Sequence, residues 1–275
     1  APGLSRLAGG PVWLKCEHRQ ETGAFKLRGA SNAAARLGEG AGGTTAPTGN
    51  HGRALAHAAR QLGLPAVICV SRLVPQNKLD AIRALDAEAR VIGASQDEAF
   101  DEARRLQREE GFALIPPFDH PDIIAGQGTA CMEAIEDAGK VDAVFASCGG
   151  GGLISGTLLA ARGLAPNAKG IGAEPQAAND ASRSLQSGII ESLSGPANTL
   201  ADGAATPSVG LHTFPLLQQL DDFYEVDEVQ IAYWTQWLQH LLKIHVEPTS
   251  ALSMSAVVSW SLEVPPGQTA VVILT

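Results

Sequence analysis

The sequence is poor in aromatic residues and in positive charge, and the shortage of positive charge excludes several classes of partner. Aromatic residues make up 5% of the 275 residues, and 20 lysines and arginines face 29 aspartates and glutamates, a net charge of −9. Binding to nucleic acid or to an anionic membrane needs a basic face. A membrane-spanning helix needs ~20 apolar residues in succession, and no run approaches that length. We therefore expect no nucleic-acid and no membrane partner.

Cysteine pairs are also lacking. The four cysteines, Cys16, Cys69, Cys131 and Cys148, are scattered and form no CxxC motif. This pattern excludes a zinc knuckle and a disulfide framework. It is typical of buried, reduced thiols, and therefore predicts a cytoplasmic protein.

What the sequence does contain is an alternation of short apolar runs with longer amphipathic runs. This alternation predicts an α/β fold whose parallel sheets are covered on both faces. The segment 38–45 is expected to be a loop that leads into a helix beginning near residue 53. The expected strands are 65–70, 90–92, 112–115, 143–146, 170–173 and 271–274, and the expected helices are 53–62, 77–85, 96–110, 126–138 and 153–161.

A lysine stands next to a phenylalanine in the segment 21–30, ETGAFKLRGA. The apolar ring of Phe25 would reduce the solvation of Lys26 and favour the neutral amine that a Schiff base requires. The alternative is a solvated lysine at the start of a helix.

The second motif is Thr48-Gly49-Asn50-His51-Gly52, directly before the expected helix. The N-terminus of a helix offers unpaired N–H groups and a dipole that bind a carboxylate or another anion. The alternative is an ordinary cap by Thr48 or Asn50. His51 is a candidate base, although a lone histidine beside a cap is more often structural.

Four consecutive glycines, residues 149–152, follow the strand expected at 143–146. Such a segment leaves backbone N–H groups free to converge on a phosphate, or else makes a tight turn. Neither the Gly-Lys-Ser/Thr of a Walker motif nor Rossmann spacing is present. A further turn carries Glu174 and Asp180 around Ala178. Its oxygens suit a hard divalent cation, and a simple capped turn is the alternative.

Taken together and in this order, these motifs resemble the fold type II pyridoxal-phosphate family, in its serine/threonine dehydratase and serine racemase branch. The similarity runs from about residue 15 to residue 275. It implies two parallel-sheet, three-layer domains with pyridoxal 5′-phosphate between them. The large domain would comprise residues 1–39 and 120–275, and the small domain residues 40–119.

The resemblance also implies roles for individual residues. The catalytic residues would be Lys26, as the Schiff-base lysine, and Thr48. Cofactor contacts are implied for Phe25, Lys26, Asn50, Gly149, Gly150, Gly151, Gly152, Leu153, Glu247 and Thr275. Substrate contacts are implied for Thr48, Gly49, Asn50, His51, Arg105 and Asp202. Glu174, the carbonyl of Ala178 and Asp180 would bind Mg²⁺ or another divalent cation.

The activity implied is a dehydratase that converts a β-hydroxy amino acid such as L-threonine or L-serine into a 2-oxo acid and ammonia. A neutral hydroxyl at Thr275 would not keep the ring nitrogen protonated, which favours elimination. Pro47 and Thr48 stand where the branch has two serines, and the bulk of Thr48 disfavours racemisation. The alternatives are a serine racemase, a dehydratase of a bulkier substrate such as phenylserine, and a non-catalytic amino-acid-binding module. A homodimer is expected.

Overall fold

The computed structural model describes residues 2–38, 40–46, 49–243 and 245–275. The chain divides into two compact units: unit 1 comprises Ala1–His18 and Gln127–Thr275, and unit 2 comprises Arg19–Gly126. This division places residues 19–39 and 120–126 with the smaller unit, whereas the predicted small domain was 40–119. The reason is local packing: Ala30 and Ala34 of α2 (Lys26–Ala35) form a buried cluster with Ala54 and Ala58 of α3 (Asn50–Leu62).

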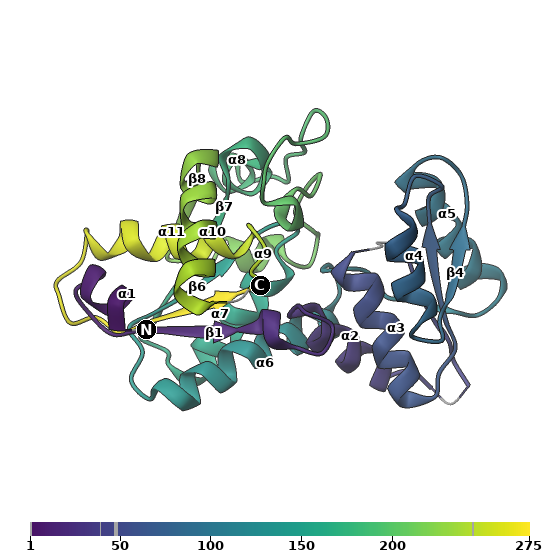
Figure 1. Cartoon of the computed structure of the whole chain (residues 1–275), viewed down its shortest axis with the longest axis horizontal. Helices are drawn as coiled ribbons and strands as arrows, with labels where there is room; N and C mark the ends of the chain where they lie inside the picture. The colour runs from purple at the N-terminus through teal and green to yellow at the C-terminus, as the bar shows by residue number, and fades with distance from the viewer. Residues whose placement is uncertain (1, 39, 47–48, 244) are drawn as a thin grey trace. The chain divides into compact units, whose positions relative to one another are not determined.

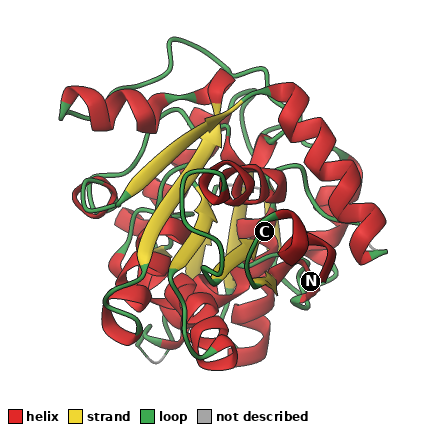
Figure 2. Cartoon of the chain, turned by 90° about the vertical axis from the view of Figure 1, so that its left-hand side faces the viewer, coloured by secondary structure: helices red, strands yellow, loops and turns green. Residues whose placement is uncertain are grey.

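Unit 1 is built on a five-stranded sheet with the order β1-β9-β6-β7-β8. Every pairing is parallel, as in the pair that joins Phe145 to Ile171. Helices lie on both sides of these strands (Figure 2). The strands are β1 (Val12–Cys16), β6 (Ala143–Ser147), β7 (Lys169–Pro175), β8 (Asp222–Val226) and β9 (Ala270–Leu274).

Alternation along the strands assigns the two principal helices of unit 1 to opposite faces. Phe145 packs edge-on against Trp260 of α11 (Ser250–Ser261), with ring centroids 5.4 Å apart. On the other face, a Cβ added to Gly170 would come within 2.5 Å of Leu158 in α7 (Gly152–Leu164). The remaining elements assigned wholly or partly to unit 1 are α1 (Pro2–Leu7), η1 (Glu17–Arg19), α6 (Pro121–Ala138), η2 (Gln176–Ala178), α8 (Asp180–Ser187), η3 (Asp202–Ala204), α9 (Phe214–Leu217) and α10 (Glu228–Leu242).

Unit 2 contains a four-stranded parallel sheet with the order β4-β3-β2-β5. Its strand β4 and its helices α3, α4 and α5 are labelled in Figure 1. Its central strand β3 alternates between two cores: Ile68 packs with α3 and α4, whereas Val67 and Cys69 pack with α5. The sheet is therefore covered on both faces, as predicted. The elements are β2 (Gly43–Thr45), β3 (Ala66–Val70), β4 (Glu88–Val91), β5 (Ala113–Leu114), α4 (Gln76–Arg83) and α5 (Gln96–Glu109).

The prediction of a loop over residues 38–45 is wrong for its last three residues. Gly43–Thr45 form the strand β2, which lies between β3 and β5 in the sheet. A Cβ on Gly43 would lie 3.1 Å from Leu55, so a glycine lets α3 pack closely on this strand. Cys69, Cys131 and Cys148 are buried thiols and Cys16 is partly buried, which agrees with the expected cysteine environment. In the described part of the chain, no helix is long and apolar enough to cross a membrane.

Candidate functional site

Lys26 is the first residue of α2 and is partly buried in unit 2. Its Nζ donates a hydrogen bond to the carbonyl of Pro117 at 2.6 Å and lies 5.2 Å from the centre of the Phe25 ring. The apolar neighbour expected from the sequence is therefore present. A lysine beside an aromatic ring and a carbonyl has the apolar, partly buried setting that favours covalent chemistry at its amine.

His51 is buried in the first turn of α3, in the same unit. Its Nε2 lies 2.9 Å from the carbonyl of Ile115, so Nε2 carries the hydrogen, because a carbonyl only accepts. Burial, then the positive charge of Lys26, lowers the pKa of His51 to about 3, against the opposing effect of the Ile115 carbonyl. His51 is thus a neutral imidazole whose Nδ1 is a buried acceptor with no partner among the described residues. His51 is therefore not a general acid at neutral pH.

The predicted anion-binding motif surrounds the start of α3. Gly49 is the cap and Asn50 the first helical residue, and no side chain caps the helix, so Asn50 is not the cap. Arg53, one turn further on, donates from Nη2 to Oδ1 of Asn50 at 2.9 Å. This contact orients the amide, and only the spacing of three residues hinted at it in the sequence. Thr48 lies outside the described residues.

The four glycines join β6 to α7 in unit 1, and their geometry requires glycine. Gly151 has φ = +91°, and a Cβ there would come within 2.8 Å of Thr213. A Cβ on Gly149 would lie 3.0 Å from Cα of Ala204. Helical hydrogen bonding begins where Ser155 N–H donates to the Gly151 carbonyl at 2.9 Å, so the preceding N–H groups have no helical acceptor. This cradle fits a phosphate.

Sequence analysis did not identify Thr213, which holds the shape of this glycine segment. Thr213 is fully buried, and its Oγ1 donates to the Gly150 carbonyl at 2.8 Å while accepting from the N–H of Gly210 at 2.9 Å. No motif marks a threonine that lies 63 positions away in the chain. Leu153, the other predicted member of the loop, is buried in the first turn of α7.

Thr275 follows β9 and is buried beside Ser250, the first residue of α11. Ser250 Oγ lies 2.9 Å from the Thr275 carbonyl and 3.2 Å from Thr275 Oγ1. Glu247 is partly buried just before α11, and its carbonyl accepts from Ser250 N–H at 2.9 Å. Asp202 is exposed at the start of η3.

Glu174 and Asp180 are both buried at the end of β7 and the start of α8. Glu174 accepts from the N–H groups of Ser182 and Ala181 at 2.7 and 3.2 Å. The carboxylate of Asp180 forms no ion pair among the described residues, and only the charge of Arg183 and the backbone N–H groups of Asp180 and Val209 act to lower its pKa. Burial outweighs these effects, and raises the pKa of Glu174 to about 8 and that of Asp180 to about 6. Two buried carboxyl groups without an ion-pair partner, next to the buried Ala178, fit a cation better than they fit an apolar core.

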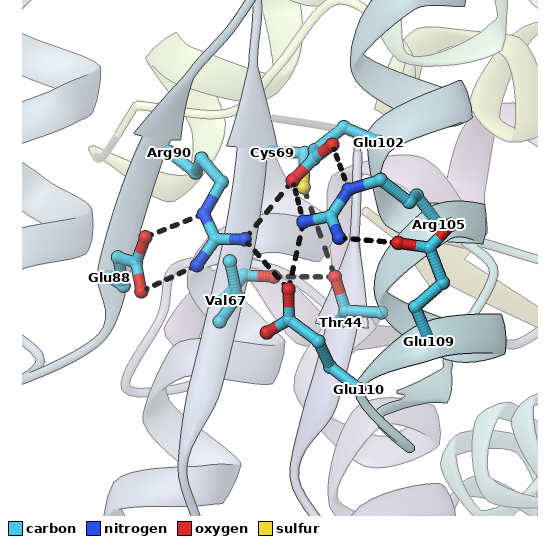
Figure 3. Close-up of polar contacts among 9 residues, drawn as sticks. All are labelled: Thr44, Val67, Cys69, Glu88, Arg90, Glu102, Arg105, Glu109 and Glu110. Carbon is cyan, nitrogen blue, oxygen red and sulfur yellow. Dashed lines mark hydrogen bonds and ion pairs between the residues drawn. The ribbon is translucent and has the colours of Figure 1, made fainter.

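Arg105, predicted to contact substrate, takes part in an ion-pair network on α5 (Figure 3). Its guanidinium contacts Glu102 at 2.8 Å, Glu109 at 2.9 Å and Glu110 at 2.8 Å. Three carboxylates of unit 2 thus pair with the positive charge of Arg105. Its contact with substrate stays a prediction.

The predicted residues thus form two groups. Unit 2 holds Phe25, Lys26, Gly49, Asn50, His51 and Arg105. Unit 1 holds Gly149, Gly150, Gly151, Gly152, Leu153, Glu174, Ala178, Asp180, Asp202, Glu247 and Thr275.

Two parallel sheets, a glycine segment that fits a phosphate and a partly buried lysine beside an aromatic ring are features expected of α/β enzymes that use a phosphorylated aldehyde cofactor. Residues 1–275 match the family described as "Pyridoxal-phosphate dependent enzyme". The chain belongs to this family, in the fold type II branch of serine/threonine dehydratases and serine racemases. The predicted family and fold class are confirmed.

The similar proteins carry different activities. The chain is 40% identical over 257 residues to the L-threo-3-hydroxyaspartate ammonia-lyase of Pseudomonas sp., covering 92% of this chain and 80% of that protein. It is also 40% identical over 249 residues to the serine racemase of Schizosaccharomyces pombe, covering 89% and 77%. The structure of the processed form of threonine deaminase isoform 2 from Solanum lycopersicum superposes with a TM-score of 0.95 at 34% identity, covering 100% and 81%.

Proposed function

We propose that this protein is a pyridoxal-phosphate-dependent ammonia-lyase that converts a β-hydroxy amino acid such as L-threonine or L-serine into a 2-oxo acid and ammonia. The observation that carries the proposal is the partly buried Lys26 amine, with Phe25 beside it and a neutral His51 nearby. The ammonia-lyases among the similar proteins support this choice of reaction.

The residues of the chain divide the work as follows. When bound, the cofactor supplies an electron sink for the carbon that loses its proton. The N–H groups of the glycine segment and the dipole of α7 bind its phosphate. Lys26 Nζ would hold the cofactor, and its amine would take the Cα proton of the substrate. Asn50, which Arg53 orients, would hydrogen-bond the phenolic oxygen of the cofactor, and the hydroxyl of Thr275 would lie near its ring nitrogen.

A serine racemase is the second candidate, because similar proteins of nearly equal identity carry that activity. Racemisation needs a second base on the opposite face of the substrate, for which Thr48 is a poorer group than a serine. Chiral analysis of serine recovered from a partial reaction separates the two: a lyase consumes one enantiomer, whereas a racemase produces the other.

The same proposal includes a divalent cation bound by Glu174, Asp180 and the Ala178 carbonyl. Burial of two carboxyl groups without a paired base supports it, since a cation would offset the cost of desolvating them. The substrate contacts of Gly49, Arg105 and Asp202, the cofactor contact of Glu247, the homodimer and the cytoplasmic location stay predictions.

The decisive experiment is borohydride reduction of the cofactor-loaded protein, followed by peptide mass spectrometry. We expect a phosphopyridoxyl group on Lys26. Lys26→Ala should lose this adduct and reduce 2-oxo acid formation by at least about 10²–10⁴-fold, the usual worth of a positioned proton-transfer group. The control is Lys140→Ala, which removes an exposed lysine. This variant should keep the adduct on Lys26 and the wild-type rate of 2-oxo acid formation. An adduct on another lysine would contradict the proposal, and a protein that takes up no cofactor would favour the amino-acid-binding module.

A further inference from the structure

A cavity of about 440 Å³ lies in unit 1. Residues of η2 and of the start of α8 line one side, and the segment 193–198 lines the other. The volume falls within the range typical of sites for small molecules. The lining includes none of the residues assigned above to the cofactor, the substrate or the cation. The cavity is therefore a candidate for a binding site of its own.

The segment 193–198 is irregular, but hydrogen bonds fix both of its ends to the rest of unit 1. At its start, the N–H of Leu193 donates to the carbonyl of Pro207 at 2.9 Å. Just after its end, the N–H of Leu200 donates to Oε2 of Glu228 at 2.8 Å. A ligand would therefore find the wall of the cavity already in place, which reduces the entropic cost of binding.

Arg183, in the first turn of α8, brings a positive charge to the cavity. Its Nη2 donates to the carbonyl of Ser192 at 2.6 Å, and this bond holds the guanidinium beside the segment. Among the described residues Arg183 forms no ion pair, and its Nε–H has no hydrogen-bond partner. A carboxylate can accept from two N–H groups of one guanidinium. The unpaired Arg183 is therefore suited to bind an anion.

The rest of the lining favours an organic anion. The amides of Asn179 and Asn198 are polar, whereas the side chains of Leu193 and Pro196 are apolar. The lining residues that the structure describes include no carboxylate and no second cation. Glu225, which accepts from Asn179 Nδ2 at 3.4 Å, is not among them. A molecule with one carboxylate and a short apolar tail matches this set of groups better than an inorganic ion, which has no apolar part.

We propose that this cavity is a second, non-catalytic binding site, and that it takes a small organic monocarboxylate whose carboxylate pairs with Arg183. The apolar tail of the ligand contacts Leu193 and Pro196. The inference goes beyond the proposed function and does not depend on it, because neither Lys26 nor the cofactor takes part in this binding.

The test is NMR of the cofactor-loaded, full-length protein, titrated with butyrate as the probe. Nitrogen-15 labelling of arginine side chains makes the Nε–H signal of Arg183 visible, and its absence from Arg183→Gln assigns it. We expect this signal to shift and to saturate with a dissociation constant of about 1 mM, the affinity usual for so small a ligand. The signal of Arg104, an exposed arginine of α5, should show no saturable shift.

The methyl signals of Leu193, which lines the cavity, report binding in the variants as well. Arg183→Gln should weaken the binding of butyrate at least about tenfold, because it removes the charge that pairs with the carboxylate. Arg183→Lys keeps the charge but not the planar pair of donors, so its affinity should lie between those of Arg183→Gln and the wild type. The matched control is Arg104→Gln, which should bind butyrate like the wild type.

Saturable shifts at Arg183 and Leu193 that weaken in Arg183→Gln would support the inference. The absence of a saturable shift at Arg183 in the wild type would overturn it, even if Arg183→Gln failed to fold. A second titration uses inorganic phosphate. Saturation by phosphate but not by butyrate would also overturn the inference, because the site would then recognise an anion without an organic tail. Butyrate binding that shifts other signals and leaves Arg183 unmoved would place the carboxylate site elsewhere.

Discussion

Two carboxylates, one in each unit, have opposite electrostatic surroundings. In unit 2, Glu102 lies between two guanidinium groups, with Arg105 at 2.8 Å and Arg90 at 3.1 Å (Figure 3). Hydrogen bonds from Arg105, then from Arg90, lower the pKa of Glu102 to about 2. In unit 1, Glu174 accepts only backbone N–H groups, and burial raises its pKa to about 8.

The difference favours a structural role for Glu102 and supports the proposed cation site at Glu174. Glu102 has its counter-charges within the fold, and its network joins α5 to β4 through Arg90. Glu174 and Asp180 form no ion pair among the described residues, and only the charge of Arg183 acts on Asp180, so both carboxyl groups remain costly to ionise. A charge cluster with internal partners therefore needs no ligand, whereas a buried carboxyl pair without an ion-pair partner supports the proposed cation.

The first test removes the carboxylate that Arg90 and Arg105 share in unit 2. Glu102→Ala removes the shared partner of two arginines, and its own side chain is only 10% exposed. We expect a loss of about 1–2 kcal/mol in the free energy of unfolding, because the two arginines keep Glu88, Glu109 and Glu110 as partners. Urea denaturation measures it. Glu109→Ala is the control: its side chain is 59% exposed, and we expect a loss below about 1 kcal/mol. Equal losses in the two variants would remove the contrast between the two carboxylates.

The second test concerns the buried carboxyl groups of Glu174 and Asp180. Adding Mg²⁺ should stabilise the wild type, by about 2.7 kcal/mol at a concentration 100 times the dissociation constant. The double substitution Glu174→Gln and Asp180→Asn should abolish this response, because neutral amides bind a hard cation weakly. Thermal unfolding with and without the ion, over a series of divalent cations, provides the measurement. Glu109→Ala should respond like the wild type. A cation response that survived the double substitution would place the ion elsewhere.

Sequence patterns predicted the fold class well where local periodicity was strong. The buried strand β3 and the amphipathic α5 were found within one residue at each end. The helix α11 was missed because it is buried on nearly all sides and so shows no polar face. The edge strand β8 was missed because only Val226 of its residues is buried. Neither element has the periodicity on which such predictions depend.

The candidate site was predictable only as far as its motifs extend. Lys26 and the glycine segment stand in recognisable local sequences. The residues that orient them do not: Thr213 contacts the glycine segment from 63 positions away, and Ser250 contacts Thr275 from 25 positions away. A single sequence does not reveal tertiary contacts of this kind, because nothing in the local sequence distinguishes these two residues from other threonines and serines.

His51 is a buried ionisable group that stays neutral in the folded protein. Its expected effect on the free energy of unfolding is the smallest of the three. It is kept neutral, with its pKa lowered to about 3 from 6.5. At this residue the unfolded chain therefore binds a proton that the folded protein does not, and the contribution of His51 to stability falls as the pH drops below about 6.5 toward 3. Between pH 6.5 and 5.5 the loss expected from His51 alone is about 1 kcal/mol. Glu174 acts in the opposite direction in this window because its pKa is raised to about 8, so the effect of His51 is the difference between variant and wild type.

His51→Asn should remove this part of the pH dependence, measured by urea denaturation at the two pH values. Glu102 contributes nothing in this window, because its own loss of stability on acidification comes between about pH 4.5 and pH 2. The control is His240→Asn, which removes an exposed histidine of α10 and leaves His51 in place. An unchanged slope in His51→Asn would mean that His51 is protonated in the folded protein, which would require a hydrogen-bond acceptor for Nδ1 that the described residues do not supply.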